Sequence, residues 1–242
     1  MGSKVALIPS VHEMLQHHVR DVKILADLFA GTGTVASSMP NSVQVRASDV
    51  MECVLCVARA RLLPMARDSA AASDSFEWVL SRAVAAAERV TKQSQACIAE
   101  EVLAMQSHAR LLALIDEAEH VGSSPSVAAR AAAVRDGGGH ELVRLYFSRG
   151  YFSTTQSIAL DCFRAVVDGR YTSESAVSWW DVCTTRDYLL AVWLSAASSM
   201  ANSPGHTGNF GDSRNRPGGV LPERGRWTHG TLCGPLTDAW MA

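Results

Sequence analysis

The sequence predicts an α/β fold that carries a large helical insertion. A strand, a glycine turn, a helix and a second strand follow one another between residues 22 and 47, which makes an incomplete sheet. Alanine-rich segments with helical spacing then fill residues 68–135, without further alternation of strand and helix. We therefore divide the chain into an α/β part (1–66), a helical region (67–206) and an irregular, divergent tail (207–242).

The composition limits the possible function classes. The 242 residues include 22 Lys and Arg against 24 Asp and Glu, a formal net charge of -2. No global positive field indicates a nucleic-acid partner, so any DNA-binding surface must be a local patch. Every apolar run is shorter than the roughly 20 residues that cross a bilayer, and the amino terminus lacks a secretory signal. We expect a cytoplasmic protein without membrane contact; its oligomeric state does not follow from the sequence.

The cysteines and histidines predict no metal site. The six cysteines are scattered, which favours free thiols over disulfides. Cys53 and Cys56 form a C-x-x-C within a predicted helix (Glu52–Leu63), but no second pair follows at zinc-finger spacing. We expect buried helical thiols instead. His17 and His18 point to different sides of a helix, which favours a surface pair.

The α/β part begins with a predicted helix. Apolar residues recur at helical spacing over residues 4–19, with an interruption near Pro9. The β-branched and apolar run 22–29 predicts a strand that leads into the glycine turn, and residues 35–39 predict a short helix. Residues 43–47 alternate like a second strand, after which another helix is expected.

The helical region is expected to contain one strand. Residues 142–147, which follow the glycines at 137–139, predict a short strand. Ser153-Thr154-Thr155-Gln156 has the spacing of a capping box, so a helix should begin there. A final long helix is predicted over Arg186–Met200. The last forty residues hold 8 of the 17 glycines, which predicts an irregular tail with little core.

The turn after the first strand is the most informative local feature. Gly31 and Gly33 let the main chain approach a ligand more closely than a side chain permits, and the following helix offers amide groups to a carboxylate. Asp49 stands where an acid can accept both ribose hydroxyls of an adenosine. Purely structural roles are the alternative: the glycines would form an ordinary tight turn, and Asp49 would cap a helix. Gly31-x-Gly33-x-x-Ala36 also fits a dinucleotide fingerprint, so a nicotinamide cofactor is an alternative.

Together these motifs resemble the adenine-specific DNA methyltransferases, the family of the bacterial DNA adenine methylases. In that family a Gly-Ser-Lys or Gly-Gly-Lys precedes D-L-F-A-G-T-G-S-V by a short helix. Here Gly2-Ser3-Lys4 precedes Asp27-Leu28-Phe29-Ala30-Gly31-Thr32-Gly33-Thr34-Val35, and Val45-Arg46-Ala47-Ser48-Asp49 is similar to the family's second strand with its ribose-binding acid.

Two later segments extend the resemblance to residues 1–206. The family has a stretch of the type Y-F-S…I-D…R and another of the type L-L-A…A-N-T-x-G-H. The first is similar to Tyr151-Phe152-Ser153 with Ile158, Asp161 and Arg164, and the second to residues 188–206. Agreement over separated motifs is more specific than the glycine turn alone.

The resemblance implies a Rossmann-like class I methyltransferase domain. Such an enzyme uses S-adenosyl-L-methionine to methylate the exocyclic amine of a flipped adenine in double-stranded DNA. The cofactor-binding residues that the resemblance implies are Lys4, Asp27, Phe29, Ala30, Gly31, Gly33 and Asp49. Lys4 and the turn from Asp27 to Gly33 would line the methionine end of the cofactor, and Asp49 would hold its ribose. The helical region, including the segment from Tyr151 to Arg164, would face DNA.

The family's catalytic motif, D-P-P-Y or N-P-P-Y, has no counterpart here, since no Pro-Pro pair occurs in the 242 residues. That motif accepts hydrogen bonds from the adenine amine and stacks on the flipped base. The sequence therefore assigns no catalytic residue and indicates a copy that stops before the motif. Two different functions also stay open: a methyltransferase acting on RNA or a small molecule, and a non-catalytic remnant that binds cofactor or DNA.

Overall fold

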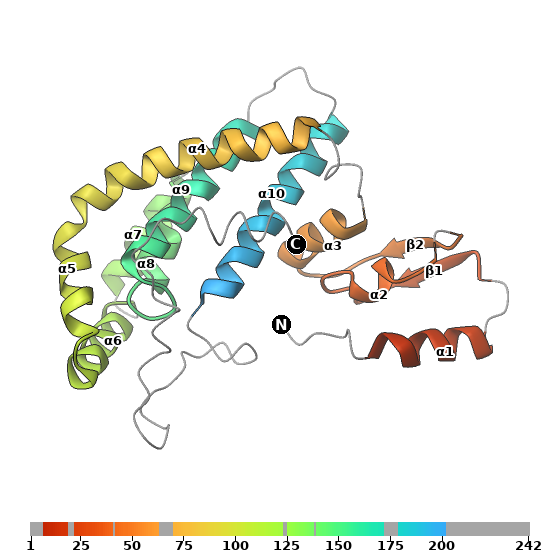
Figure 1. Ribbon diagram of the computed structural model, residues 1–242, viewed down its shortest axis with the longest axis horizontal. Coiled ribbons are helices and arrows are strands. Elements are labelled where there is room, and N and C mark those ends of the chain that lie inside the picture. Colours follow the sequence, from red (N-terminus) through yellow and green to blue (C-terminus); the bar gives the residue numbers. More distant parts are fainter. Residues whose placement is uncertain are drawn as a thin grey trace. The chain divides into compact units, whose positions relative to one another are not determined.

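The computed structural model describes residues 7–18, 22–40, 42–62, 70–122, 125–137, 139–171 and 179–201. Figure 1 shows the order of the elements along the chain. The chain forms two compact units, which we describe separately. Unit 1 comprises Met1–Ser75 with Ser175–Ala191, and unit 2 comprises Phe76–Glu174 with Val192–Ala242.

Unit 1 contains the predicted succession of strand, turn, helix and strand. Its elements are α1 (Ile8–His18), β1 (Ile24–Asp27), α2 (Thr34–Ser37), β2 (Gln44–Ala47) and α3 (Glu52–Leu62). The two strands pair in parallel, from Ile24 opposite Gln44 to Asp27 opposite Ala47. Both strands end at the same edge because the pairing is parallel, and the glycine turn leaves β1 at that edge. The amino-terminal part therefore has an α/β structure with a small parallel sheet.

Helix α3 supplies much of the buried apolar surface of unit 1. It buries Val54, Val57 and Ala58, which share one side of the helix at i, i+3 and i+4, and it also buries Cys56. The strands are less covered, since both alternate between exposed and half-buried residues. Helix α1 is tied to the end of α2 by a hydrogen bond of 3.0 Å between His12 Nε2 and Ser38 Oγ.

Unit 2 is helical, as the alanine-rich periodicity predicts. Its helices are α4 (Ala70–Gln93, which begins in unit 1), α5 (Gln95–Ala104), α6 (His108–Gly122), α7 (Pro125–Asp136), α8 (Leu142–Phe147) and α9 (Thr154–Tyr171). Helix α9 carries the three largest fully buried apolar side chains of the described residues, Ile158, Leu160 and Phe163. The Phe163 ring lies 6.5 Å from the ring of Phe76 on α4.

Residues 142–147 form helix α8, so the predicted strand is wrong. The cause is a carboxylate from another helix. Asp161 on α9 accepts the backbone N–H groups of Val143 (3.0 Å) and Arg144 (2.9 Å), two of the donors that a helix start leaves without an intrahelical partner. The β-branched and aromatic composition favours a strand, but this long-range cap stabilises the first turn of a helix.

Other helix boundaries are close to the predictions. Pro9 lies in the first turn of α1 and does not interrupt it, because the first turn needs no N–H from that residue. The last long helix, α10 (Trp179–Met200), begins earlier than predicted. The capping box is confirmed: Ser153 N–H donates to Gln156 Oε1 (2.9 Å), and Gln156 N–H donates to Ser153 Oγ (3.2 Å).

Within the described ranges, no helix has the length and apolarity needed to cross a membrane. The same ranges also contain no group of three or more His, Cys, Asp or Glu residues placed to hold a metal ion. The predicted tail (207–242) and Lys4 lie outside the described residues.

Candidate functional site

The glycine turn adopts the conformation that its sequence predicts. Gly31 (φ 55°) and Gly33 (φ 73°) both have the left-handed backbone that side chains disfavour. The turn is closed by a hydrogen bond of 2.9 Å from Gly33 N–H to the Ala30 carbonyl. It is also joined to the end of β2, since Ala30 N–H donates to the Ser48 carbonyl at 3.0 Å.

The two glycines have different surroundings. A Cβ atom at Gly33 would lie 3.1 Å from the backbone Cα of Ala58, so the absence of a side chain lets α3 approach the turn. A Cβ atom at Gly31 would meet no atom of the described residues within 4 Å. Gly33 is therefore required for packing as well as for its backbone conformation, whereas no described residue crowds Gly31.

Asp49 holds the turn in place. Its Oδ2 accepts the N–H of Gly31 at 2.9 Å, and its Oδ1 accepts the N–H of Met51 at 3.0 Å just before α3. Asp49 therefore joins the turn to the residue before α3, but it accepts neither bond from the first turn of the helix and is not the helix cap that the sequence left open. Asp27, at the end of β1, accepts the N–H of Phe29 at 3.3 Å.

Large apolar side chains are exposed where the strands end. Leu28 and Phe29 follow β1, with Phe29 73% exposed, and Val50 and Met51 follow β2, with Val50 92% exposed. Ala30, by contrast, is buried. Because both strands end at one edge of the sheet, carboxylates, an open glycine and exposed apolar side chains occur together there. The sequence prediction had named Phe29 and the turn that contains Leu28, but not Val50 or Met51, for this edge.

Ion pairs fix the orientation of α3. Arg59 on α3 pairs with Glu52 (2.8 Å) and with Asp187 on α10 (3.0 Å), and the Cys56 thiol donates to Asp187 Oδ1 at 3.6 Å. Burial, reinforced by the charge of Asp187, raises the pKa of Cys56 to about 11. Cys56 is thus a neutral hydrogen-bond donor rather than a nucleophile.

The prediction of buried thiols is correct for Cys56 but wrong for Cys53, which is exposed on the first turn of α3. The four cysteines at positions 53, 56, 97 and 162 are free thiols, as expected. His17 is exposed, in agreement with its predicted surface position.

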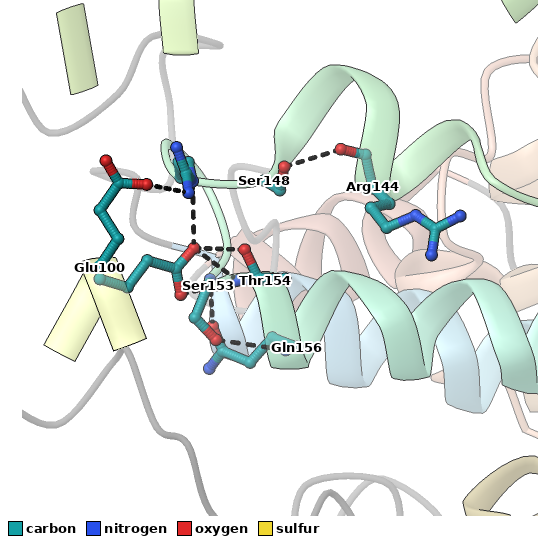
Figure 2. Close-up of polar contacts among 8 residues, drawn as sticks. Glu100, Arg144, Ser148, Ser153, Thr154 and Gln156 are labelled. Carbon is teal, nitrogen blue, oxygen red and sulfur yellow. Dashed lines mark hydrogen bonds and ion pairs between the residues drawn. The ribbon is translucent and has the colours of Figure 1, made fainter. Parts of the chain in front are cut away.

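Unit 2 contains a buried carboxylate that the sequence prediction missed. Glu101 on α5 is 0% exposed and accepts hydrogen bonds from the Thr154 hydroxyl and from Thr154 N–H, the latter at 3.0 Å. Arg149 Nε lies 3.7 Å from Glu101 Oε1, and Arg149 Nη2 forms an ion pair of 2.6 Å with Glu100. Figure 2 shows Thr154 and Gln156 at the start of α9 within this network.

This network holds the turn that precedes α9. Arg149 has a positive φ of 63°, and its N–H donates to the Phe152 carbonyl at 2.7 Å. Burial raises the pKa of Glu101, although Thr154 and Arg149 act in the opposite direction. No local sequence signal predicts these contacts, because Glu101 and Thr154 are 53 residues apart.

The segment from Tyr151 to Arg164 is mainly buried, which corrects the expectation that it faces DNA. Every residue from Phe152 to Asp161 is buried, and the Asp161 carboxylate accepts a backbone N–H group at the start of α8. Arg164 forms an ion pair of 2.6 Å with Asp168. The motif that resembles Y-F-S…I-D…R therefore has structural roles within unit 2.

Comparison with known families supports a methyltransferase. Residues 1–78, which include both strands, the glycine turn and α3, match the D12 class N6 adenine-specific DNA methyltransferases. The resemblance of the amino-terminal part to adenine-specific DNA methyltransferases is thereby confirmed. No curated protein and no solved structure matches the chain.

Proposed function

We propose that the chain binds S-adenosyl-L-methionine at the glycine turn and serves adenine-specific methylation of double-stranded DNA. The observation that carries this proposal is Gly31, which has a left-handed backbone, is crowded by none of the described residues and is held by Asp49 at the edge where both strands end. In open α/β sheets such edges are the usual ligand sites. The family match spans this whole feature.

The residues at this edge fit the chemistry of the cofactor. A carboxylate suits the ribose hydroxyls, so we assign Asp49 to the ribose. Exposed apolar side chains suit the flat adenine ring, and Phe29 and Val50 are the most exposed of them. Asp27, Ala30, Gly31 and Gly33 shape the turn, and Lys4 is assigned by resemblance alone. We propose that the fold is of the Rossmann-like class I type.

The bound cofactor would supply the methyl group as an electrophilic sulfonium. The chain's own residues are proposed to bind and orient it. We assign no catalytic residue, because the 242 residues contain no counterpart of the D-P-P-Y motif. The helical region 67–206 is proposed to recognise the target DNA through exposed residues rather than through the buried segment 152–161.

Calorimetry with S-adenosylhomocysteine and NAD in parallel tests the cofactor. Saturable binding of S-adenosylhomocysteine but not of NAD is expected, and the reverse result would favour a dehydrogenase. Asp49→Ala should weaken S-adenosylhomocysteine binding by about 1.5–3 kcal/mol, the range for a hydrogen bond to a charged group. Unchanged affinity would contradict the ribose assignment.

A gel-shift comparison of duplex DNA with structured RNA tests the substrate class, because preferential RNA binding would favour an RNA enzyme.

A second candidate is a non-catalytic protein that binds the cofactor or DNA. The missing Pro-Pro pair favours it. Duplex DNA incubated with tritiated S-adenosyl-L-methionine distinguishes the two, since methyl transfer above background requires a catalytic site. Cofactor binding without transfer would support the second candidate.

A further inference from the structure

Arg61, near the end of α3, reaches the glycine turn with one nitrogen of its guanidinium. Its Nη1 donates to Thr34 Oγ1 at 2.8 Å and to the Thr32 carbonyl at 3.3 Å. The Thr32 and Thr34 hydroxyl oxygens are themselves 3.2 Å apart. A long side chain from α3 is thus fixed at the turn that separates β1 from α2.

The remaining N–H groups of this guanidinium make no hydrogen bond in the described part of the chain. Arg61 also forms no ion pair there, whereas Arg59, two residues earlier, pairs with both Glu52 and Asp187. The side chain of Arg61 is exposed. An arginine with unused donors and an uncompensated charge is suited to bind a carboxylate through two parallel hydrogen bonds.

We propose that Arg61 binds the amino-acid carboxylate of the cofactor. The proposal rests on the function proposed above. That carboxylate is the only anionic group of S-adenosyl-L-methionine, whose sulfonium and ammonium groups are cationic. Asp49 accepts hydrogen bonds and Arg61 donates them, so the two residues would distinguish the ribose end of the cofactor from the methionine end.

Isothermal titration of the full chain with two ligands tests this role. S-adenosylhomocysteine has the carboxylate, whereas 5′-deoxy-5′-methylthioadenosine keeps the adenosine and the thioether but lacks the whole amino-acid group. Arg61→Gln should weaken S-adenosylhomocysteine about tenfold and change methylthioadenosine less than twofold, since about 1.4 kcal/mol corresponds to a factor of ten. Arg61→Lys keeps the charge and should recover part of the loss.

Thr34→Val is the matched control, because it removes the 2.8 Å contact to Arg61 but keeps the guanidinium and its contact with the Thr32 carbonyl. It should affect both ligands equally and weakly. An equal loss of both ligands in Arg61→Gln would show that Arg61 only braces the turn and would overturn the proposal. Undiminished S-adenosylhomocysteine binding in Arg61→Gln, with a loss in Lys4→Gln instead, would assign the carboxylate to Lys4.

Failure of the proposed function gives a different result. In that case the unsubstituted chain itself would bind neither adenosine ligand. The circular dichroism spectrum of each variant confirms that it is folded before titration, and retention of the fold is expected for Arg61→Gln because Arg61 is exposed.

Discussion

Replacement of Glu101 should destabilise the start of α9 more than any nearby surface substitution. The Glu101 carboxylate is fully buried, accepts two hydrogen bonds from Thr154 and faces Arg149 at 3.7 Å. Glu101→Ala leaves two buried Thr154 donors without an acceptor. Removal of one partner from a buried charged network costs about 3–5 kcal/mol. Glu101→Gln keeps one acceptor oxygen and should cost about 1–2 kcal/mol.

Glu100→Ala is the matched control. Glu100 precedes Glu101 on the same helix and pairs with the same arginine at 2.6 Å, but its side chain is 56% exposed. An exposed ion pair contributes about 0.2–1 kcal/mol. The three variants should therefore rank Glu101→Ala, Glu101→Gln, Glu100→Ala in decreasing effect.

Hydrogen exchange measured by mass spectrometry reports on this region directly. Peptides covering residues 148–160 should exchange on the order of a thousandfold faster in Glu101→Ala, because each 1.4 kcal/mol is a factor of ten in the opening equilibrium. Peptides of unit 1 serve as the internal reference. If Glu101→Ala and Glu100→Ala gave the same exchange rates, the carboxylate would not stabilise this region.

The network should also depend on pH. Burial raises the pKa of Glu101, so the folded chain binds this proton more tightly than the unfolded chain. The stability supplied by this group is greatest below the ordinary glutamate pKa and falls as the pH rises above it. The unsubstituted chain should therefore lose stability relative to Glu101→Gln as the pH rises above about 4.

Four other substitutions test single contacts. Gly33→Ala should lower the free energy of unfolding by more than the roughly 1–2 kcal/mol of left-handed strain, because its Cβ would lie 3.1 Å from Ala58. Gly31→Ala should cost the strain alone. Equal shifts of the melting temperature in the two variants would contradict the packing argument. Ser157→Ala should stabilise unit 2 by up to about 1 kcal/mol in urea unfolding, because its buried hydroxyl has no hydrogen-bond partner among the described residues. Burial raises the pKa of Asp161 from 3.8 to about 7, so folding takes up a proton in that range and stability from this group falls as the pH rises through it. Urea midpoints at pH 5 and pH 8 should differ less in Asp161→Asn, and an unchanged difference would mean that another group titrates.

The sequence alone determined the local features of this protein. Left-handed backbone at Gly31 and Gly33 follows from residue type, since glycine adopts a positive φ at little cost. The reciprocal hydrogen bonds between Ser153 and Gln156 follow from a three-residue spacing. Both features depend on atoms a few residues apart, which the order of residues specifies directly.

The tertiary structure decided which elements and side chains these local features meet. Residues 142–147 have strand-like composition but form a helix, because Asp161 supplies acceptors from 17 and 18 residues away. Glu101 reaches Thr154 across 53 residues, and Arg61 reaches Thr34 across 27. Contacts of this kind depend on how helices pack, because side chains distant in sequence share a hydrogen bond only after the chain has folded.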